Sequence, residues 1–124
     1  MNTLVISLGS NSPDREWQMR HAIERIKKHF SNVKLSDIYE TPEHSGKYEP
    51  YLNCVIIAET NMELDEANKF MKQWESLCGR TPNSKLIGVI PIDLDIVIWN
   101  YETIRPVEFG RSYFQQGYIQ LCKK

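Results

Sequence analysis

The stretch IDLDIVIW, residues 92–99, alternates apolar side chains with others along most of its length. Successive residues of a β-strand point to opposite faces of the sheet, so this pattern predicts a strand over residues 92–99. The even-numbered residues are expected on the core face, and the opposite face is expected to hold Asp93, Asp95, Val97 and Trp99. The fold must therefore contain a β-sheet with one face turned towards an apolar core.

Two amphipathic helices are predicted before this strand. The first covers residues 13–30, where Ser12 is the expected N-cap, Pro13 takes the first position and apolar residues recur at helical spacing. The second is expected to be capped by Asn61 and to stop before Gly79, where a C-terminal glycine belongs. Each helix carries one apolar stripe, which indicates packing against a sheet.

Three more strands are predicted over residues 3–8, 33–39 and 51–60. Residues 41–50 and 80–91 are expected to be loops, and a short helix over residues 112–121 is expected to be interrupted by Gly117. The order β-α-β-β-α-β predicts an α+β, ferredoxin-like fold, with two helices on one face of an antiparallel sheet. The other face would be free to carry a site.

Length and charge limit the classes of function. The 124 residues suit a single domain over residues 1–124. Lysine and arginine number 15 against 16 aspartate and glutamate, a net charge of −1. This balance provides no field for gathering nucleic acid or an anionic membrane, so we expect small-molecule partners held by local groups.

The cysteines and the N-terminal residues indicate the cellular compartment. Cys54, Cys78 and Cys122 are odd in number and widely spaced, which fits neither a disulfide framework nor a zinc site. The sequence starts with a strand-like segment rather than a basic leader, and no apolar run approaches membrane-spanning length. A cytoplasmic protein is expected, and the sequence leaves its oligomeric state open.

Asp93 and Asp95 are the first candidate site. Residues two apart on a strand share a face, so the two carboxylates should lie side by side. Their repulsion would be relieved by a divalent cation, and Mg²⁺ characteristically takes one or two carboxylates together with water and substrate phosphates. On the pattern alone, an ordinary solvated strand face with acids on it is the favoured interpretation.

Three other groups of polar residues invite a functional interpretation. Gly9-Ser10-Asn11 lies between the first strand and helix, where it could bind an anion or simply form a turn, and local sequence favours the turn. Tyr39, Tyr51 and Asn53 lie near strand ends, where they could bind a flat heterocycle or serve as half-buried strand residues. The histidines indicate no metal site, and His44 is expected to be exposed.

Five short motifs follow one another along the chain: Leu8-Gly9-Ser10-Asn11, Tyr39-Glu40-Thr41-Pro42, Tyr51-Leu52-Asn53, Glu75 with Gly79-Arg80, and Ile92-Asp93-Leu94-Asp95-Ile96. In this order and spacing the chain resembles the 6-hydroxymethyl-7,8-dihydropterin pyrophosphokinase family. The resemblance implies a ferredoxin-like enzyme that transfers pyrophosphate from ATP to a hydroxymethyl dihydropterin, a step of folate synthesis. Phosphoryl-type transfer depends on positioning and charge neutralisation, which suits the carboxylate pair.

The resemblance also assigns roles to residues. Two Mg²⁺ ions would be held by Asp93 and Asp95, and these two residues with Arg80 would form the catalytic centre. The nucleotide side would use Glu75, Arg80, Lys85 and Arg111. The pterin pocket would use Thr41, Pro42, Tyr51, Asn53 and Tyr118.

The chain departs from the family between Arg80 and the final strand. The family has an arginine-rich loop there, whereas this chain has Ile87 at the position of a tryptophan, Ile90 at that of an arginine, and Lys85 as the one cation of residues 81–91. Each charge-assisted bond to a phosphate contributes about 1.5–3 kcal/mol. Arg111 could substitute from a shifted position, and the C-terminal part is shorter than in typical members.

Three functional hypotheses follow. The first is an active Mg²⁺-dependent pyrophosphokinase with a remodelled loop. The second is a family descendant that binds a pterin or nucleotide with weak or no transfer. The third is an unrelated ferredoxin-like interaction module whose acids are part of its surface.

Overall fold

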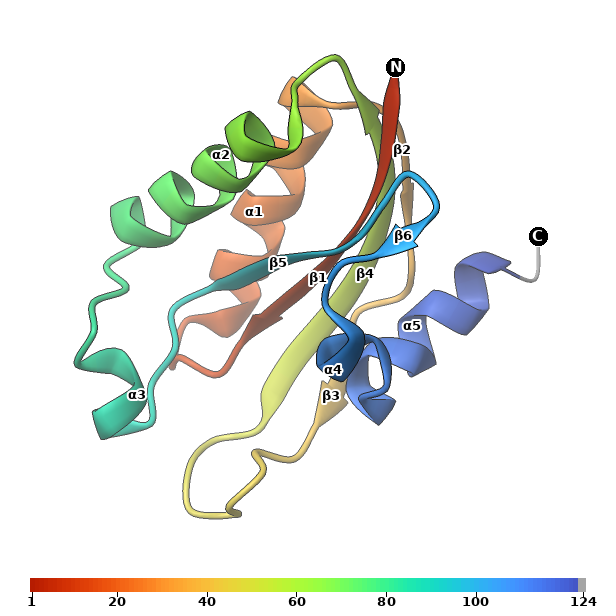
Figure 1. Cartoon of the computed structure of the whole chain (residues 1–124). Helices are drawn as coiled ribbons and strands as arrows, with labels where there is room; N and C mark the ends of the chain where they lie inside the picture. Colours follow the sequence, from red (N-terminus) through yellow and green to blue (C-terminus); the bar gives the residue numbers. More distant parts are fainter. Residues whose placement is uncertain (123–124) are drawn as a thin grey trace.

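The structure is a computed structural model that describes residues 1–122 (Figure 1). Its strands are β1 (Asn2–Ser10), β2 (Ser31–Leu35), β3 (Tyr39–Thr41), β4 (Tyr51–Thr60), β5 (Asp93–Trp99) and β6 (Glu102–Thr103). Its helices are α1 (Arg15–His29), α2 (Leu64–Leu77), α3 (Ser84–Ile87), α4 (Pro106–Phe109) and α5 (Ser112–Cys122). The strands form one antiparallel sheet in the order β2-β4-β1-β5-β6, with β3 also paired to β4.

Helices α1 and α2 cover one face of this sheet (Figure 1). The apolar stripe of each helix packs on the inward residues of the central strands, and the fully buried members of this core include Leu4, Ile6, Met19, Ile56, Met71, Leu94 and Ile96. Burial of this apolar surface is the main stabilising contribution. The predicted α+β, ferredoxin-like arrangement is therefore confirmed.

The opposite face is partly covered by helices, so only part of it is free to carry a site. Helices α4 and α5 lie on it (Figure 1), and Phe114 of α5 is buried with Val5, Val55 and Val97 in a second apolar cluster. Sequence analysis also expected Gly117 to interrupt this helix, but α5 continues through it. A Cβ at Gly117 would lie 2.7 Å from Val55 Cγ2, so glycine allows α5 to pack closely on β4.

A β-bulge alters the predicted alternation in β5. Val5 pairs with Ile98 and Ile6 pairs with Ile96, so Val97 is an extra residue on the β5 side. Beyond it the faces exchange, and Ile98 joins the α5 cluster whereas Trp99 packs on the α1–α2 core. The sheet faces predicted for residues 92–97 are therefore correct, and those predicted for Ile98 and Trp99 are wrong.

Several predicted boundaries also differ. Strand β1 continues to Ser10, because Gly9 and Ser10 pair with Asn53 and Leu52 of β4. The predicted strand over residues 33–39 is two strands, β2 and β3, separated where the Asp37 amide donates to the Gln120 side chain of α5 (2.8 Å).

The helix caps differ from the predicted ones. Helix α1 begins at Arg15 with Asp14 as N-cap, because the Arg15 amide closes a turn onto the Ser12 carbonyl (3.1 Å). Helix α2 is capped by a reciprocal pair, Glu63 and Glu66, rather than by Asn61. The loop predicted over residues 80–91 contains α3, and α4 and β6 were not predicted. No helix within residues 1–122 is long and apolar enough to cross a membrane.

Candidate active site

The site lies on the α5 side of the sheet, at the end of the three central strands. Gly9 of β1 pairs with Asn53 of β4 and with Asp93 of β5, so these residues form one row across the sheet. Gly9 has no side chain, and a Cβ there would come within 3.5 Å of Asn53 Oδ1. The sheet therefore has an open floor between a carboxamide and a carboxylate.

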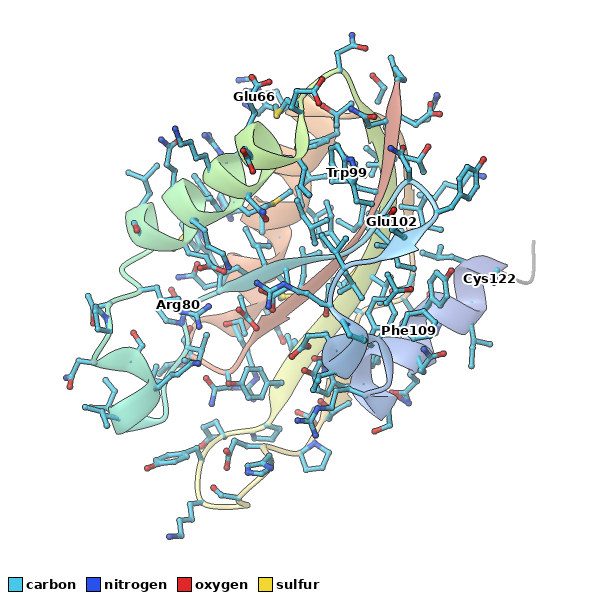
Figure 2. All side chains as sticks on the ribbon, viewed as in Figure 1. Glu66, Arg80, Trp99, Glu102, Phe109 and Cys122 are labelled. Carbon is cyan, nitrogen blue, oxygen red and sulfur yellow. The ribbon has the colours of Figure 1, made fainter. Side chains whose placement is uncertain are left out.

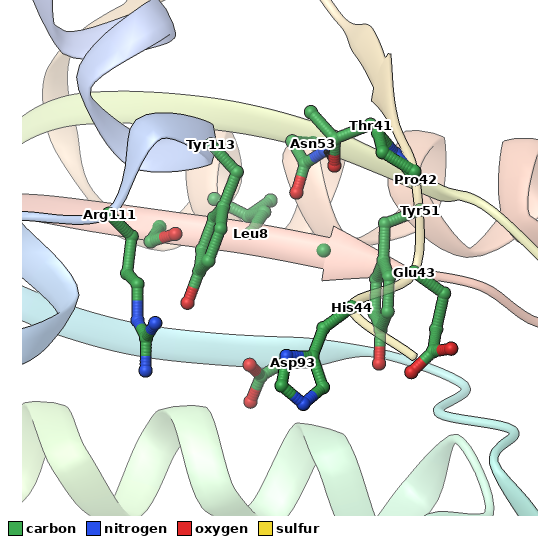
Figure 3. Close-up of a pocket in the computed structure, with 12 residues that line it drawn as sticks. Leu8, Thr41, Pro42, Glu43, His44, Tyr51, Asn53, Asp93, Arg111 and Tyr113 are labelled. Atoms are coloured by element: carbon green, nitrogen blue, oxygen red, sulfur yellow. Dashed lines mark hydrogen bonds between the residues drawn. The ribbon is translucent and has the colours of Figure 1, made fainter. Parts of the chain in front are cut away.

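A cavity of about 360 Å³ opens above this floor (Figure 3). Its walls come from β1, from β3 and the loop after it, from β4, from β5 and from the start of α5. The lining residues are Ser7, Leu8, Gly9, Thr41, Pro42, Glu43, His44, Tyr51, Asn53, Asp93, Arg111 and Tyr113. Four of the five predicted substrate-binding residues therefore meet at one cavity.

Asn53 is held in a fixed orientation. Its Nδ2 donates to Thr41 Oγ1 (2.6 Å) and to the Tyr39 carbonyl (3.4 Å), so both bonds use the nitrogen end of the amide. Tyr51 and Tyr113 stand on either side of the cavity in Figure 3. Burial raises the pKa of the Tyr51 phenol, and the nearby Asp93 carboxylate raises it further. Aromatic walls beside an oriented amide suit a flat, polar, hydrogen-bonding ring.

Tyr118 is the predicted substrate-binding residue that does not line the cavity. It lies one turn further along α5 than Phe114 and stacks on that ring, with centroids 5.3 Å apart. Tyr113, five residues earlier, lines the cavity instead. The close approach of α5 to the sheet at Gly117, which the sequence alone presented as a helix breaker, fixes a helix register in which Tyr113 rather than Tyr118 reaches the cavity.

The two aspartates share a face as predicted, but their environments differ. Asp93 lines the cavity, whereas Asp95 is 8% exposed. Burial and the neighbouring Asp93 charge raise the pKa of Asp95 to about 6, against the partial opposition of Lys72 and Arg105. The pair thus has the unfavourable concentration of negative charge that a divalent cation relieves.

Side chains from α2 and from the segment after it reach the carboxylates around the edge of β5. Glu75 Oε2 accepts a hydrogen bond from the Leu94 amide (2.8 Å), which satisfies an edge-strand N–H. Arg80 lies beside the start of β5 (Figure 2), with its Nη1 2.7 Å from Asp93 Oδ1 and 3.3 Å from Glu75 Oε2. The predicted residues Glu75, Arg80 and Asp93 therefore form one connected ion-pair network.

Two further cations contact Asp95. Lys72 Nζ lies 3.4 Å from Asp95 Oδ1 and 3.3 Å from Glu75 Oε2, and Arg105 Nη2 lies 3.5 Å from the same Asp95 oxygen. Sequence analysis identified neither residue. Lys72 had a usable signal, because residues i and i+3 share a helix face and Glu75 was already a candidate. Arg105 had no such signal in the sequence, because its position beside Asp95 depends on how the chain turns through β6.

A second, shallower recess of about 290 Å³ has Arg80 in its wall. It is lined by Lys72, Glu75, Ser76, Arg80, Thr81, Pro82 and Lys85. Three of these seven residues are cations, so the recess suits an anionic ligand. Arg80 lines this recess and also contacts Asp93 of the first cavity, and it therefore connects the two spaces.

The remaining candidates are placed as follows. Gly9-Ser10-Asn11 is no open anion loop, since Ser10 and Asn11 are 0% and 2% exposed. His44 is exposed, as expected, but it also lines the first cavity beside Glu43. Cys54, Cys78 and Cys122 are free thiols. Residues 1–122 contain no cluster of three or more carboxylate, histidine or cysteine groups able to hold a metal.

Comparison with known families gives a consistent result. The family model described as 7,8-dihydro-6-hydroxymethylpterin-pyrophosphokinase (HPPK) matches residues 5–121. The chain is 34% identical to a Bacillus subtilis protein named 2-amino-4-hydroxy-6-hydroxymethyldihydropteridine pyrophosphokinase, over 99% of this chain and 80% of that protein. A protein of the same name from Aquifex aeolicus is 33% identical over 85% of this chain and 66% of its own length.

Longer proteins also match. A folate synthesis bifunctional protein from Chlamydia muridarum is 36% identical over 82% of this chain, which corresponds to 24% of that protein. The similarity is therefore to one part of the bifunctional protein. The matches support the predicted family and favour the pyrophosphokinase hypothesis over an unrelated interaction module.

Proposed function

The chain belongs to the 7,8-dihydro-6-hydroxymethylpterin-pyrophosphokinase family, and on that premise we propose that it transfers pyrophosphate from ATP to 6-hydroxymethyl-7,8-dihydropterin, a step of folate synthesis. The hydroxymethyl oxygen forms a bond to the β-phosphorus of ATP. The bond from that phosphorus to the oxygen bridging the α- and β-phosphates breaks, AMP leaves, and the hydroxyl proton is released. We treat residues 1–124 as one domain that acts in the cytoplasm.

One observation carries this proposal: two differently lined spaces meet at the Arg80–Asp93 ion pair. The first has aromatic walls and an oriented amide, which suit the pterin. The second is lined by cations, which suit the triphosphate. Transfer between two bound substrates depends mainly on holding the acceptor oxygen and the phosphorus in line, and the shared ion pair marks where the two ligands would meet.

The pterin side would work through Asn53 and the tyrosines. Thr41 and the Tyr39 carbonyl hold the amide nitrogen of Asn53, which orients its oxygen to accept N–H groups of the pterin. Tyr51 and Tyr113 would pack on the ring, and Pro42 would close one wall. The position of Asp93 in the same row as Asn53 would place the hydroxymethyl group near the carboxylate pair.

The nucleotide side would use the cations around β5. Arg80, Lys72 and Lys85 line the recess, and Arg111 reaches the pterin cavity from the residue just before α5. Arg80, Lys72 and Arg111, together with Arg105 beside Asp95, provide positive charge from outside the arginine-poor loop. Asp93 and Asp95 fit Mg²⁺ by their donor type and mutual repulsion, and bound Mg²⁺ would neutralise phosphate charge during transfer.

Binding measurements test the two halves separately. Calorimetric titration with ATP should show tight binding only when Mg²⁺ is present, and Asp93→Ala and Asp95→Ala should each abolish the Mg²⁺-dependent part. Unchanged affinity in both variants would contradict the assigned metal ligands. Fluorescence titration with the dihydropterin should saturate, and Asn53→Ala should weaken it strongly. Absence of a saturable signal in the unmodified protein would contradict the pterin assignment.

A further inference from the structure

Tyr113, which forms one side of the first cavity (Figure 3), is held at two points by residues outside the cavity lining. Its backbone carbonyl accepts a hydrogen bond from the Tyr39 hydroxyl of β3, and its own hydroxyl donates to Glu108 Oε2 of α4. The Tyr39 hydroxyl also accepts from the Gly117 amide (3.1 Å), one turn further along α5. Tyr113 is therefore fixed by the sheet at its backbone and by α4 at the tip of its ring.

The bond at the tip controls a motion that the backbone bond does not. A tyrosine ring is joined to its backbone through two rotatable bonds, so a bond to the carbonyl leaves other rotamers open. Tyr113 is half-buried, and packing does not fully enclose its ring. A bond from the hydroxyl to a carboxylate is charge-assisted and fixes both torsions together. Burial and the Glu108 carboxylate raise the pKa of the Tyr113 phenol, so the hydroxyl keeps the proton that it donates.

Helix α4 keeps its shape through contacts that do not use the Glu108 side chain. The Phe109 amide donates to the Arg105 carbonyl (2.9 Å), which closes the turn of α4. Gln115 of α5 provides a separate link between the two helices, because its Nε2 donates to the Phe109 carbonyl (2.5 Å). Glu108 can therefore be changed without removing the bonds that fold this segment, and Gln115 offers a matched comparison.

We propose that Glu108 is a positioning residue, which holds the Tyr113 ring in place as a wall of the first cavity and so sets the affinity for the pterin. This inference rests on the proposed function, because it assigns the pterin to that cavity. A ring that is already in place loses little freedom when a ligand packs on it, whereas a free ring must be ordered on binding. Glu108 acts on the ring and not on the ligand, so the effect belongs to pterin binding and not to nucleotide binding.

The test is the dissociation constant of 6-hydroxymethyl-7,8-dihydropterin, measured by fluorescence on the unmodified protein and three variants. Glu108→Ala should raise this constant about fivefold, within the range for ordering one side chain on binding. Glu108→Gln keeps an oxygen that can accept the phenol proton, and it should recover most of the affinity. Tyr113→Phe keeps the ring but lacks the hydroxyl, so it should bind the pterin as weakly as Glu108→Ala.

A double-substitution cycle and a control show whether Glu108 acts through Tyr113. In the Tyr113→Phe protein, Glu108→Ala should change the pterin dissociation constant no further, because the bond that it removes is already absent. Gln115→Ala removes the other side-chain link between α4 and α5, and it should change this constant by less than about twofold. The dissociation constant of ATP with Mg²⁺ should be the same in the unmodified protein and in Glu108→Ala.

The outcomes separate the inference from the function it rests on. The positioning role is refuted, while the proposed function stands, if Glu108→Ala binds the pterin as tightly as the unmodified protein. It is also refuted if the loss persists in the Tyr113→Phe background or is reproduced by Gln115→Ala. If the unmodified protein does not bind the pterin, both are refuted. Should Glu108→Ala fail to fold, Tyr113→Phe decides: weaker pterin binding supports the role, and unchanged binding refutes it.

Discussion

Asp95 shows how one residue links the site to stability. Burial and the adjacent Asp93 raise its pKa from 3.8 to about 6. Metal-free folded protein therefore holds this proton more tightly than the unfolded chain does. The resulting stabilisation is fully present below pH 3.8 and is lost as the pH rises through about 6.

A pH series of denaturation measurements checks this expectation. In EDTA, the free energy of unfolding should fall by about 1 kcal/mol from pH 5 to pH 7 on account of Asp95. Asp95→Asn cannot titrate at this position, so its free energy of unfolding should fall by correspondingly less. Parallel profiles for the two proteins would show that Asp95 has an ordinary pKa.

Lys72 is the residue that we expect to compensate most for the arginine-poor loop. Its ammonium lies between Asp95 and Glu75 and faces the cationic recess. Because the side chain is 47% exposed, its contribution is screened. Lys72→Met should raise the KM for ATP about fivefold, which corresponds to about 1 kcal/mol, with a smaller effect on the KM for the pterin.

Lys69→Met is the matched control for that substitution, since Lys69 lies on the same helix but is not among the residues lining the cationic recess. It should leave both KM values unchanged. Equal effects of the two substitutions on ATP would indicate a general electrostatic contribution of α2 rather than a specific contact by Lys72.

At the scale of elements, α5 positions one wall of the cavity. It contributes Tyr113 to the lining, and its contact with the sheet centres on Gly117. The Gly117 amide donates to Tyr39 Oη (3.1 Å), and burial raises the pKa of that phenol to about 12. Docking of this helix therefore links the sheet to the aromatic wall of the first cavity.

Gly117→Ala tests this docking. The new methyl group would lie 2.7 Å from Tyr39 Oη and from Val55 Cγ2, so overpacking should outweigh the gain in helix propensity. We expect a loss of about 1–2 kcal/mol in the free energy of unfolding, together with weaker pterin binding. Gly110→Ala is the control, because the nearest atoms there are 3.7 Å away, and it should change neither quantity appreciably. An undisturbed Gly117→Ala variant would contradict the close packing of α5.

The elements that sequence predicted well are those whose signal is local. Periodicity located α1, α2 and the four main strands, because each places a regular apolar stripe or face on one core. The bulge at Val97 and the break between β2 and β3 were missed, since both depend on contacts with distant segments. The C-terminal helices were weakly marked because α5 packs through a glycine.

The distinction between local signals and distant contacts also applies to the candidate site. Asp93 and Asp95 could be paired from strand geometry, and the family motifs located Asn53, Tyr51 and Arg80. Arg105 and Tyr113 could not be found in this way, because they reach the site from segments whose course is set by tertiary packing. Neither could the contacts of Asn11, whose side chain bonds to Glu49, Gly88 and Ile90, 38 to 79 positions away in the sequence.

For the whole molecule, the proposed function depends on two spaces that meet at Arg80 and Asp93 on a ferredoxin-like sheet. The spaces have different linings, and the chemistry requires both to be filled together. The family match and the named relatives support a pyrophosphokinase that acts on a hydroxymethyl dihydropterin. What distinguishes pyrophosphoryl transfer from other uses of ATP is the identity of the products.

The most direct measurement is therefore product analysis of a turnover reaction with ATP, Mg²⁺ and 6-hydroxymethyl-7,8-dihydropterin, followed by phosphorus NMR and mass spectrometry. We expect AMP and the diphosphate ester of the dihydropterin in equal amounts, and we expect neither product from Asp93→Ala. Formation of ADP or free phosphate in place of AMP, or an unmodified pterin after prolonged incubation, would contradict the proposed function.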